Sequence, residues 1–256
     1  MKILKHLAPA FLRRRDLEIQ RRLEHLEFSM FRLDAAFDAL VVSPKFVAAD
    51  AVGFNGQRHR KRMFSDLISA IPFDAIVETG TWLGNTTGYM AQTARRPIHS
   101  CEVNPRFHAL AKMRLTDCEQ VHLELSDSRA FLENLSRRDL AGKCVFFYLD
   151  AHGYDDLPLV GELGIIATHW GRFVGMIDDF RVPDDAGYGY DNYGNGKALT
   201  LELLRPVIDK HNLAVFFPAA SSLEETGARR GSVVLTPKGE LSQHLSSLAS
   251  LRQCPT

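Results

Sequence analysis

The sequence predicts an α/β fold in which a mostly parallel, doubly wound sheet ends in an antiparallel hairpin. Short apolar segments alternate with segments of helical periodicity between residues 74 and 210, as expected for strand–helix–strand units with right-handed crossovers. The last two apolar segments, 213–217 and 230–235, are joined by a short polar connection, so they should pair as a hairpin.

Each element of this prediction has a local signal. Pro105 stands at a first-turn position, where its missing N–H costs nothing, and Cys144 begins a nearly continuous apolar run that is typical of a strand covered on both faces. The predicted strands are 74–78, 97–102, 121–125, 144–150, 173–178, 213–217 and 230–235. One predicted helix ends at about residue 71. The others span about 86–95, 104–115, 130–136, 159–167 and 197–210.

The chain is predicted to have three parts, which are an N-terminal helical extension (1–54), one α/β domain (55–240) and a tail that forms a loose helix (241–256). Residues 11–40 read as one amphipathic helix, which packs on the domain or on a second copy of the chain in a homo-oligomer. Alternatively, the basic residues among positions 2–15 hold it against an anionic membrane. A second basic cluster at 58–62 is either a solvated face or a cover for the site.

Composition excludes several classes of partner. Because Lys and Arg together number 31 and so do Asp and Glu, the formal net charge is zero, and this balance predicts no nucleic-acid partner. No run of eighteen apolar residues is present, so no transmembrane segment is expected. The four cysteines lack metal-ligand spacing, which predicts a reducing, cytoplasmic location.

The first predicted strand ends in Glu78 and runs into a turn with glycines at 80 and 84, which is typical of a nucleotide-binding loop. A carboxylate at the strand end would repel a pyrophosphate, whereas S-adenosylmethionine carries a sulfonium, an ammonium and no phosphate. The turn therefore predicts S-adenosylmethionine as the cofactor. The residues expected to bind it here are Glu78, Gly80, Thr81, Gly84 and Thr86, and Asn85 or Thr86 is expected to cap the next helix. The alternative is an ordinary glycine-rich strand–helix turn.

Glu102 ends the second predicted strand, about twenty residues beyond the glycine turn, where doubly wound folds bind ribose hydroxyls. The turn resembles the first motif of class I S-adenosylmethionine-dependent methyltransferases, which implies a Rossmann-like fold. The resemblance also implies that Asp127 meets the adenine amino group, with Ser128 beside it. The alternative is that Asp127 or Ser128 only caps the following helix.

Three carboxylates, Asp150, Asp178 and Asp179, follow two predicted neighbouring strands. The carboxyl ends of parallel strands meet at one edge of a sheet, where ligand crevices lie, so these side chains should converge. Either one of them is protonated or a divalent cation lies between them, and ligands that are all oxygen favour Mg²⁺, Ca²⁺ or Mn²⁺. The alternative is capping and solvation at the strand ends.

The segments Leu-Asp-Ala-His at 149–152 and Ile-Asp-Asp-Phe at 177–180 resemble metal-dependent O-methyltransferases. The likeness is nearest to the macrocin O-methyltransferase and cephalosporin-hydroxylase-like group, whose members act on sugar hydroxyls and other small polar substrates, and it covers about 55–237. It implies that Asp150, Asp178 and Asp179 bind Mg²⁺, which would hold the substrate hydroxyl and lower its pKa. The chain departs from the group at His152 and in a loop rich in glycine and tyrosine, so the substrate cannot be carried over.

His152 and this loop complete the candidate site. An imidazole titrates near neutrality, so His152 could take the acceptor proton, with Asp150 as its catalytic neighbour; it could equally be a metal ligand or bond to the backbone. The loop, residues 181–196, is predicted to be a substrate lid in which Tyr188, Tyr190 and Tyr193 contact the acceptor, with a plain surface loop as the alternative.

These patterns predict a Mg²⁺-assisted O-methyltransferase that acts on a small polar acceptor, such as a sugar or glycoside hydroxyl. Two alternatives remain at the level of the sequence. One is a cofactor-binding module without catalysis that acts through a protein partner, and the other is an oxidative enzyme of the same fold.

Overall fold

The computed structural model describes residues 19, 22, 23, 52–138, 140–153, 156–194 and 196–254. The chain divides into two units, Met1–Val47 and Ala48–Thr256, and the elements described below belong to the second unit. The amphipathic helix predicted over residues 11–40 lies outside the described residues except at positions 19, 22 and 23. Its roles as an oligomer contact or a membrane contact therefore stay predictions.

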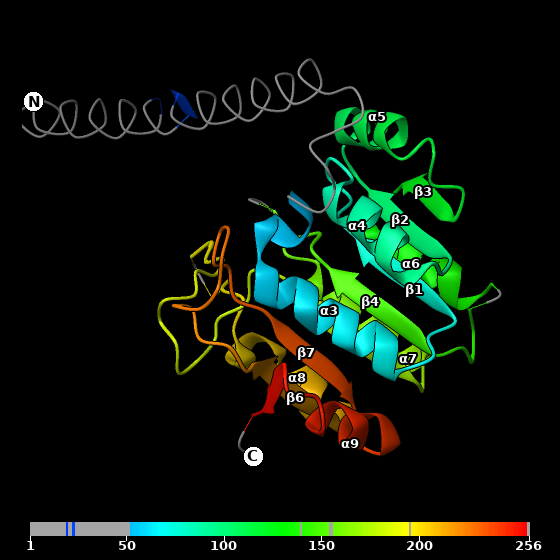
Figure 1. Cartoon of the computed structure of the whole chain (residues 1–256). Coiled ribbons are helices and arrows are strands. Elements are labelled where there is room, and N and C mark those ends of the chain that lie inside the picture. The colour runs from blue at the N-terminus through cyan, green and yellow to red at the C-terminus, as the bar shows by residue number, and fades with distance from the viewer. Residues whose placement is uncertain are drawn as a thin grey trace, which may run out of the picture. The chain divides into compact units, whose positions relative to one another are not determined.

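An eight-stranded sheet with the order β3-β2-β1-β4-β5-β7-β6-β8 forms the centre of the second unit (Figure 1). Strands β1 to β5 are parallel, β7 is antiparallel to both β5 and β6, and β8 is antiparallel to β6. The strands are β1 (Ala75–Thr79), β2 (Ile98–Glu102), β3 (Val121–Leu125), β4 (Val145–Leu149), β5 (Phe173–Ile177), β6 (Leu213–Pro218), β7 (Val233–Pro237) and β8 (Leu251–Gln253). The predicted doubly wound sheet with its antiparallel hairpin is confirmed.

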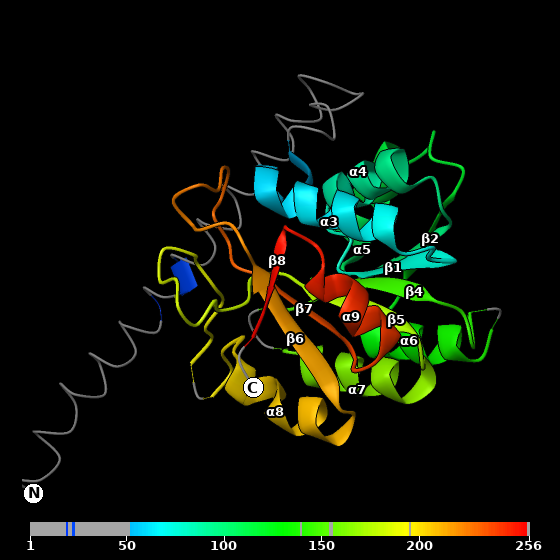
Figure 2. The same cartoon turned by 60° about the horizontal axis from the view of Figure 1, so that its bottom comes forward.

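Helices cover both faces of this sheet, which explains why β1, β4 and β5 are buried along their whole length. One face packs against α3 (Arg58–Ala70), α4 (Asn85–Ala94) and α9 (Glu240–Ser246), and the other packs against α6 (Ser128–Ser136), α7 (Leu159–His169) and α8 (Leu201–Lys210). Helix α5 (Pro105–Arg114) lies beside β2 and β3, and a short 3-10 turn, η1 (Gly53–Gly56), precedes α3. The two views in Figures 1 and 2 show this layering.

Two elements differ from the prediction. Helix α8 begins at Leu201 and not at 197, because Leu199 donates its N–H to the Asp191 carbonyl and so joins the preceding loop. The tail is not one loose helix from 242 onward, since α9 is followed by β8, where Arg252 pairs with Phe217 of β6. This pairing covers the exposed edge that β6 would otherwise present.

The carboxyl ends of the parallel strands bring the segments after β1, β2, β4 and β5 to one edge of the sheet. Backbone hydrogen bonds hold these segments in register: the N–H of Gly80 donates to the Cys101 carbonyl, and that of Asp150 to the Thr79 carbonyl. This edge carries nearly all of the predicted site residues. Within the described part of the chain, no helix combines the length and the apolar character needed to cross a membrane.

Candidate functional site

The turn after β1 brings two parts of the predicted site together. Gly80 has a φ of +84° and packs so closely on β4 that a Cβ atom there would lie 2.3 Å from the Asp150 carbonyl oxygen. Gly84, with a φ of +74°, is the N-cap residue of α4 and makes no side-chain cap. Only glycine accommodates both the left-handed conformation and this close approach. The turn therefore touches the segment that carries the acidic residues.

Glu78 lies beneath the turn and is almost completely buried. Its Oε2 atom accepts hydrogen bonds from the hydroxyls of Thr87 in α4 (2.5 Å) and Ser100 in β2 (2.6 Å). Burial raises the pKa of Glu78 to about 7, although the two hydroxyls act in the opposite direction. In this structure the carboxyl group braces α4 and β2 from below the turn.

This buried carboxyl group predicts a specific dependence of stability on pH. Unfolded chains release the Glu78 proton near 4.5 and the folded protein near 7, so folding loses stability as pH rises through this window. We expect Glu78→Gln, which mimics the protonated acid, to have a free energy of unfolding up to about 3 kcal/mol above that of the wild type at pH 8. At pH 4 the two proteins should be equally stable.

Urea unfolding of the cofactor-free proteins at both pH values measures this difference. Glu119→Gln is the matched control, because Glu119 is exposed. An equal effect of Glu78→Gln at pH 4 and pH 8 would contradict the proposed origin of the pH dependence.

Glu102 ends β2 beside the turn and is nearly buried. Its Oε2 atom accepts the N–H of Trp82 (2.7 Å), and its Oε1 atom accepts the N–H of Asn104 (2.8 Å). Each carboxylate oxygen can accept a further hydrogen bond, so two ribose hydroxyls could bind here. The Trp82 ring makes an edge-to-face contact with Phe107.

Asp127 is the N-cap residue of α6. Capping is the role that the sequence offered as the alternative to a contact with adenine. The Oδ1 atom of Asp127 accepts the N–H groups of Arg129 (2.9 Å) and Ala130 (3.3 Å), and the Arg129 guanidinium also binds the carboxylate. The hydrogen bond from the Arg129 side chain lowers the pKa of Asp127. Ser128 is buried as the first residue of α6. A contact of Asp127 or Ser128 with adenine stays a prediction.

The two threonines of the turn have structural partners. The Thr81 hydroxyl and the Ser100 hydroxyl are 2.6 Å apart, and the Thr86 hydroxyl accepts the backbone N–H of Phe54 (3.1 Å). The expected capping of α4 by Asn85 or Thr86 is wrong, since Gly84 holds the N-cap position without any side-chain cap. Thr86 instead ties η1 to α4.

Asp178 does not join the other two aspartates, so the predicted metal triad is corrected. Its carboxylate is fully buried, forms an ion pair with Arg60 and accepts hydrogen bonds from the Tyr148 hydroxyl and from Asn55 Nδ2 (3.3 Å). A carboxylate with these partners is compensated within the protein. Asp178 therefore links α3 and η1 to the end of β5.

Asp150, Asp179 and His152 do converge, with ligand atoms that all lie within 4.8 Å of one another. The His152 Nε2 atom lies 3.6 Å from Asp150 Oδ1, 3.6 Å from Asp179 Oδ2 and 3.7 Å from Asp191 Oδ2. Arg230 donates from Nε to Asp179 Oδ1 (2.6 Å) and also binds Asp191. The site is thus a cluster of three carboxylates, one imidazole and one guanidinium.

Burial and charge act against each other on the pKa values of this cluster. Burial raises the pKa of Asp150 to about 7, while His152 pulls it down. Burial alone would raise the pKa of Asp179, but His152 and Arg230 outweigh it and lower that pKa to about 2. For the imidazole of His152 burial acts in the other direction and would lower its pKa. The carboxylates of Asp179, Asp150 and Asp191 outweigh burial and raise the pKa.

The residues of this cluster fit a divalent cation. The His152 side chain is only 4% exposed, and its Nε2 atom has no hydrogen-bond partner among the described residues. Separations of 3.6 Å are too long for hydrogen bonds. They match the spacing of two ligand atoms on one ion, because atoms about 2.0–2.3 Å from an ion lie roughly 3–4 Å from each other. The donors are carboxylate oxygens and one imidazole nitrogen, which agrees with the alternative that the sequence left open for His152 as a metal ligand.

The glycine- and tyrosine-rich loop is hydrogen-bonded to the rest of the domain through Gly189 and Asp191, and its role as a substrate lid stays a prediction. Tyr188 is 4% exposed and donates its hydroxyl to the Ala220 carbonyl (3.0 Å), and its contact with the acceptor stays a prediction. Tyr190 lies beneath the Arg181 guanidinium, and Tyr193 donates its hydroxyl to Asp191. Both of these rings are partly exposed.

Arg60, Asp191 and Arg230 are the residues of the site that the sequence analysis missed. Arg60 belongs to the basic cluster at 58–62, where its side chain is 1% exposed while that of Arg62 is 67% exposed. The helical spacing does carry a signal, because Arg60 falls on the same stripe as Met63, Phe64 and Leu67, whereas Arg62 does not. Asp191 and Arg230 lie 39 positions apart, and only the folded chain brings them together.

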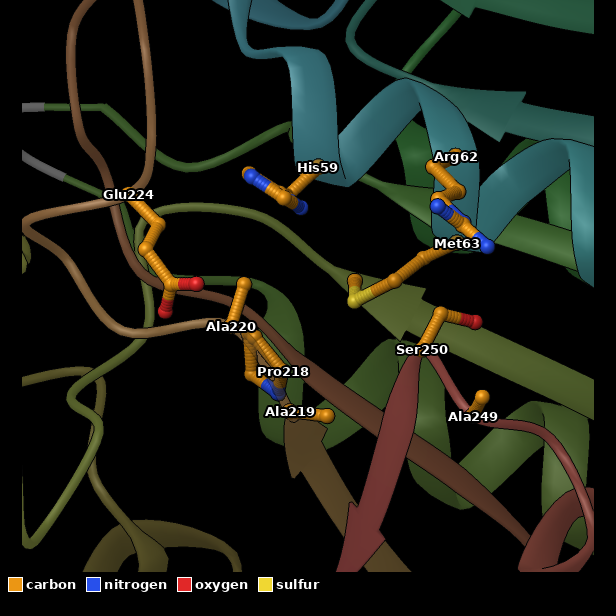
Figure 3. A pocket seen from close by; sticks show the side chains of 9 residues that line it. All are labelled: His59, Arg62, Met63, Pro218, Ala219, Ala220, Glu224, Ala249 and Ser250. Carbon is orange, nitrogen blue, oxygen red and sulfur yellow. The ribbon is translucent and has the colours of Figure 1, made fainter.

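A cavity of about 280 Å³ lies apart from the predicted residues (Figure 3). It opens between the first turns of α3, the last residue of β6 and the residues that precede β8. Its lining residues are His59, Arg62, Met63, Pro218, Ala219, Ala220, Glu224, Ala249 and Ser250. Neither the predicted cofactor-binding residues nor the cluster around Asp150 and Asp179 lines this cavity, so it is separate from the candidate site.

Comparison with solved structures supports the fold. An O-methyltransferase from Bacillus cereus in complex with SAH is 13% identical, with a TM-score of 0.50 over 71% of this chain and 81% of that chain. A putative O-methyltransferase from Klebsiella pneumoniae is 16% identical with the same TM-score and coverage. No protein-family model matches the chain, and no curated protein matches it in sequence. The described domain therefore has the Rossmann-like fold of these methyltransferases.

Proposed function

We propose that this protein is an S-adenosylmethionine-dependent O-methyltransferase that acts on a hydroxyl of a small polar molecule, such as a sugar or glycoside. One observation carries the proposal: the glycine turn packs directly on the Asp150 carbonyl, so a cofactor loop and an acidic cluster meet at one edge of the sheet. The segments 149–152 and 177–180, which resemble the macrocin O-methyltransferase-like group, are the reason for proposing a sugar or glycoside acceptor.

The cofactor would bind across the ends of β1 and β2. Gly80 and Gly84 let the backbone approach it, and Glu102 would accept hydrogen bonds from the ribose hydroxyls. Glu78 would act from beneath by holding the turn in place, through Thr87 and Ser100. Thr81 and Thr86 support the same turn, and Asp127 and Ser128 lie at the end of β3 where adenine is expected.

Loss of Glu102 should weaken cofactor binding. We expect Glu102→Ala to lower the affinity for S-adenosylmethionine roughly tenfold to a hundredfold, or about 1–3 kcal/mol, because the ribose hydroxyls lose a buried acceptor. Calorimetric titration measures the change, with Glu119→Ala as the exposed control. Equal affinities in Glu102→Ala and the wild type would remove the ribose assignment.

The acceptor hydroxyl would lie beside Asp150 and Asp179, near the partly exposed rings of Tyr190 and Tyr193. Its oxygen attacks the methyl carbon in line; the C–S electron pair stays on sulfur, and the hydroxyl proton leaves. We assign this proton to Asp150, because its side chain, 32% exposed, is the most accessible carboxylate of the cluster. His152 is buried with its Nε2 atom turned toward three carboxylates, which favours the ligand role over the role of base.

Of the three aspartates predicted to bind Mg²⁺, Asp150 and Asp179 remain available, because Asp178 is paired with Arg60. A divalent cation held there would supply positive charge beside the acceptor oxygen and lower the pKa of that hydroxyl. Asp150 and Asp179 would also orient the acceptor and keep the reacting groups together.

A screen for methyl transfer tests the proposal. The full chain is incubated with S-adenosylmethionine labelled in its methyl group and a panel of sugars, glycosides and phenols, with and without Mg²⁺ or Mn²⁺. Labelled O-methyl product in a cation-dependent reaction is the expected result. Cofactor binding without any methylated product would favour the non-catalytic module, and oxidised product would favour the oxidative relative.

The remaining partner predictions accompany this proposal. A small-molecule acceptor is expected, nucleic acid is not, and a homo-oligomer would use the N-terminal helix. The four cysteines form no disulfide bond, and the cytoplasmic location that their spacing predicts stays a prediction.

A further inference from the structure

The 3-10 turn η1 joins the proposed cofactor loop to the buried carboxylate of Asp178. It packs against α3 and α4, which lie side by side in both views (Figures 1 and 2). The Phe54 N–H donates to Thr86 Oγ1 in the first turn of α4 (3.1 Å), and Asn55 Nδ2 donates to Asp178 Oδ2 (3.3 Å). Asn55 therefore lies between the glycine turn and the end of β5.

The backbone of η1 is held in an uncommon conformation. Phe54 has a φ of +51° and Asn55 a φ of +57°, so two consecutive residues other than glycine are left-handed. Asparagine adopts this conformation readily, but phenylalanine rarely does. The fully buried Phe54 ring makes edge-to-face contacts with Tyr89 and Tyr148, at centroid separations of 5.5 and 5.1 Å. Packing thus fixes a backbone shape of the kind that is frequent at ligand-binding sites.

The side chain of Asn55 is exposed although its backbone is fixed. The Asn55 main-chain carbonyl accepts the Ala228 N–H (3.1 Å), and Gln57 exchanges two hydrogen bonds of 2.8 Å with the backbone of Arg230. Because the Asp178 carboxylate is paired with a guanidinium, it can only accept, so the Asn55 amide nitrogen faces it and Oδ1 points in a different direction. No described residue donates a hydrogen bond to that oxygen, which leaves a positioned acceptor at the edge of the site.

The proposed position of the cofactor brings its amino-acid end toward η1. Glu102 at the end of β2 would hold the ribose, whereas the methyl group has to reach the acidic cluster after β4 and β5. Strand β1 lies between β2 and β4, so the cofactor would cross the glycine turn with its sulfonium toward β4. The amino-acid end branches from that sulfonium and carries an α-ammonium group, which needs hydrogen-bond acceptors. The turn η1, which packs on α4, lies beside this path.

We propose that Asn55 binds the amino-acid end of S-adenosylmethionine, with its Oδ1 atom accepting a hydrogen bond from the α-ammonium group. The inference rests on the proposed function and extends it to a part of the cofactor that Glu102 does not hold. A carboxamide suits this place, because it accepts from the ammonium group without adding a further negative charge beside Asp178.

The test compares two ligands by calorimetric titration of the full chain. S-adenosylhomocysteine keeps the amino-acid end of the cofactor, whereas 5′-methylthioadenosine keeps the adenine, the ribose and the sulfur but lacks that end. We expect Asn55→Gly to bind S-adenosylhomocysteine roughly tenfold more weakly than the wild type, and to bind methylthioadenosine with the same affinity. Glycine preserves the left-handed backbone without strain, so the substitution removes only the side chain.

Asn212→Gly is the matched control. Asn212 is also exposed and left-handed, with a φ of +49°, but it precedes β6 at the opposite edge of the sheet. This variant should bind both ligands like the wild type. Glu102→Ala should show a third pattern and bind both ligands more weakly, because both contain the ribose.

A measurement on the wild type alone covers the case in which Asn55→Gly does not fold. The side-chain amide signals of Asn55 in nitrogen-15 NMR should shift when S-adenosylhomocysteine is added and stay in place with methylthioadenosine. Equal affinities of Asn55→Gly and the wild type for S-adenosylhomocysteine, or an equal loss of affinity for both ligands, would overturn the inference alone. So would Asn55 signals that both ligands shift alike. A wild type that binds neither ligand would overturn the proposed function as well.

Discussion

Replacing Arg60 by methionine should lower the free energy of unfolding by about 3–5 kcal/mol. The substitution leaves the Asp178 carboxylate buried without its guanidinium partner, because both side chains are only 1% exposed. It also removes hydrogen bonds to the carbonyls of Arg230 and Gly231. Urea unfolding at pH 7 measures the loss.

Two variants separate this electrostatic effect from a loss of packing. Arg62→Met removes a guanidinium from the same helix at a position that is 67% exposed, so it should change stability by less than about 0.5 kcal/mol. Adding Asp178→Asn to Arg60→Met removes the unpaired charge and should restore part of the stability. If the double variant is no more stable than Arg60→Met, the unpaired carboxylate is not the cause.

Much of the fold could be predicted from the sequence because its signals are local. The strands around residues 76, 146 and 175 are apolar runs, and Pro105 and the glycines at 80 and 84 mark the turns and helix starts. The carboxylates that follow these strands were found for the same reason. The parallel order of the strands then places them at one edge, and Asp150 and Asp179 do meet there.

The partners of those carboxylates could not be predicted, because pairing depends on contacts between distant segments. Asp178 and Asp179 are adjacent in sequence and equal in chemistry, yet one turns to Arg60, 118 positions away, and the other to Arg230. Tyr188 reads as a loop residue beside glycines, but its ring belongs to the buried core and its hydroxyl binds the distant Ala220 carbonyl. Local pattern carries no information about such choices.

Substitution of Asp179 should have the second large effect, because Asp179 lies in the acidic cluster whereas Asp178 is paired with Arg60. Asp179 has a φ of +53°, a conformation that asparagine also adopts readily, so Asp179→Asn should keep the backbone intact. It removes one of the two aspartates that remain to hold the cation. We expect methyl transfer to fall on the order of a hundredfold to a thousandfold, which corresponds to several kcal/mol of transition-state stabilisation.

The affinity for S-adenosylmethionine shows whether Asp179→Asn impairs methyl transfer without impairing cofactor binding. Because Glu102 and the glycine turn bind the cofactor away from Asp179, calorimetry should find S-adenosylmethionine bound to Asp179→Asn as tightly as to the wild type. A chelator should reduce turnover of the wild type in the same way, and Mn²⁺ should restore it. Asp184→Asn should keep full turnover, since its carboxylate is exposed and paired with Arg252. Full activity of Asp179→Asn in excess chelator would show that transfer needs no cation and would leave proton removal to Asp150 alone.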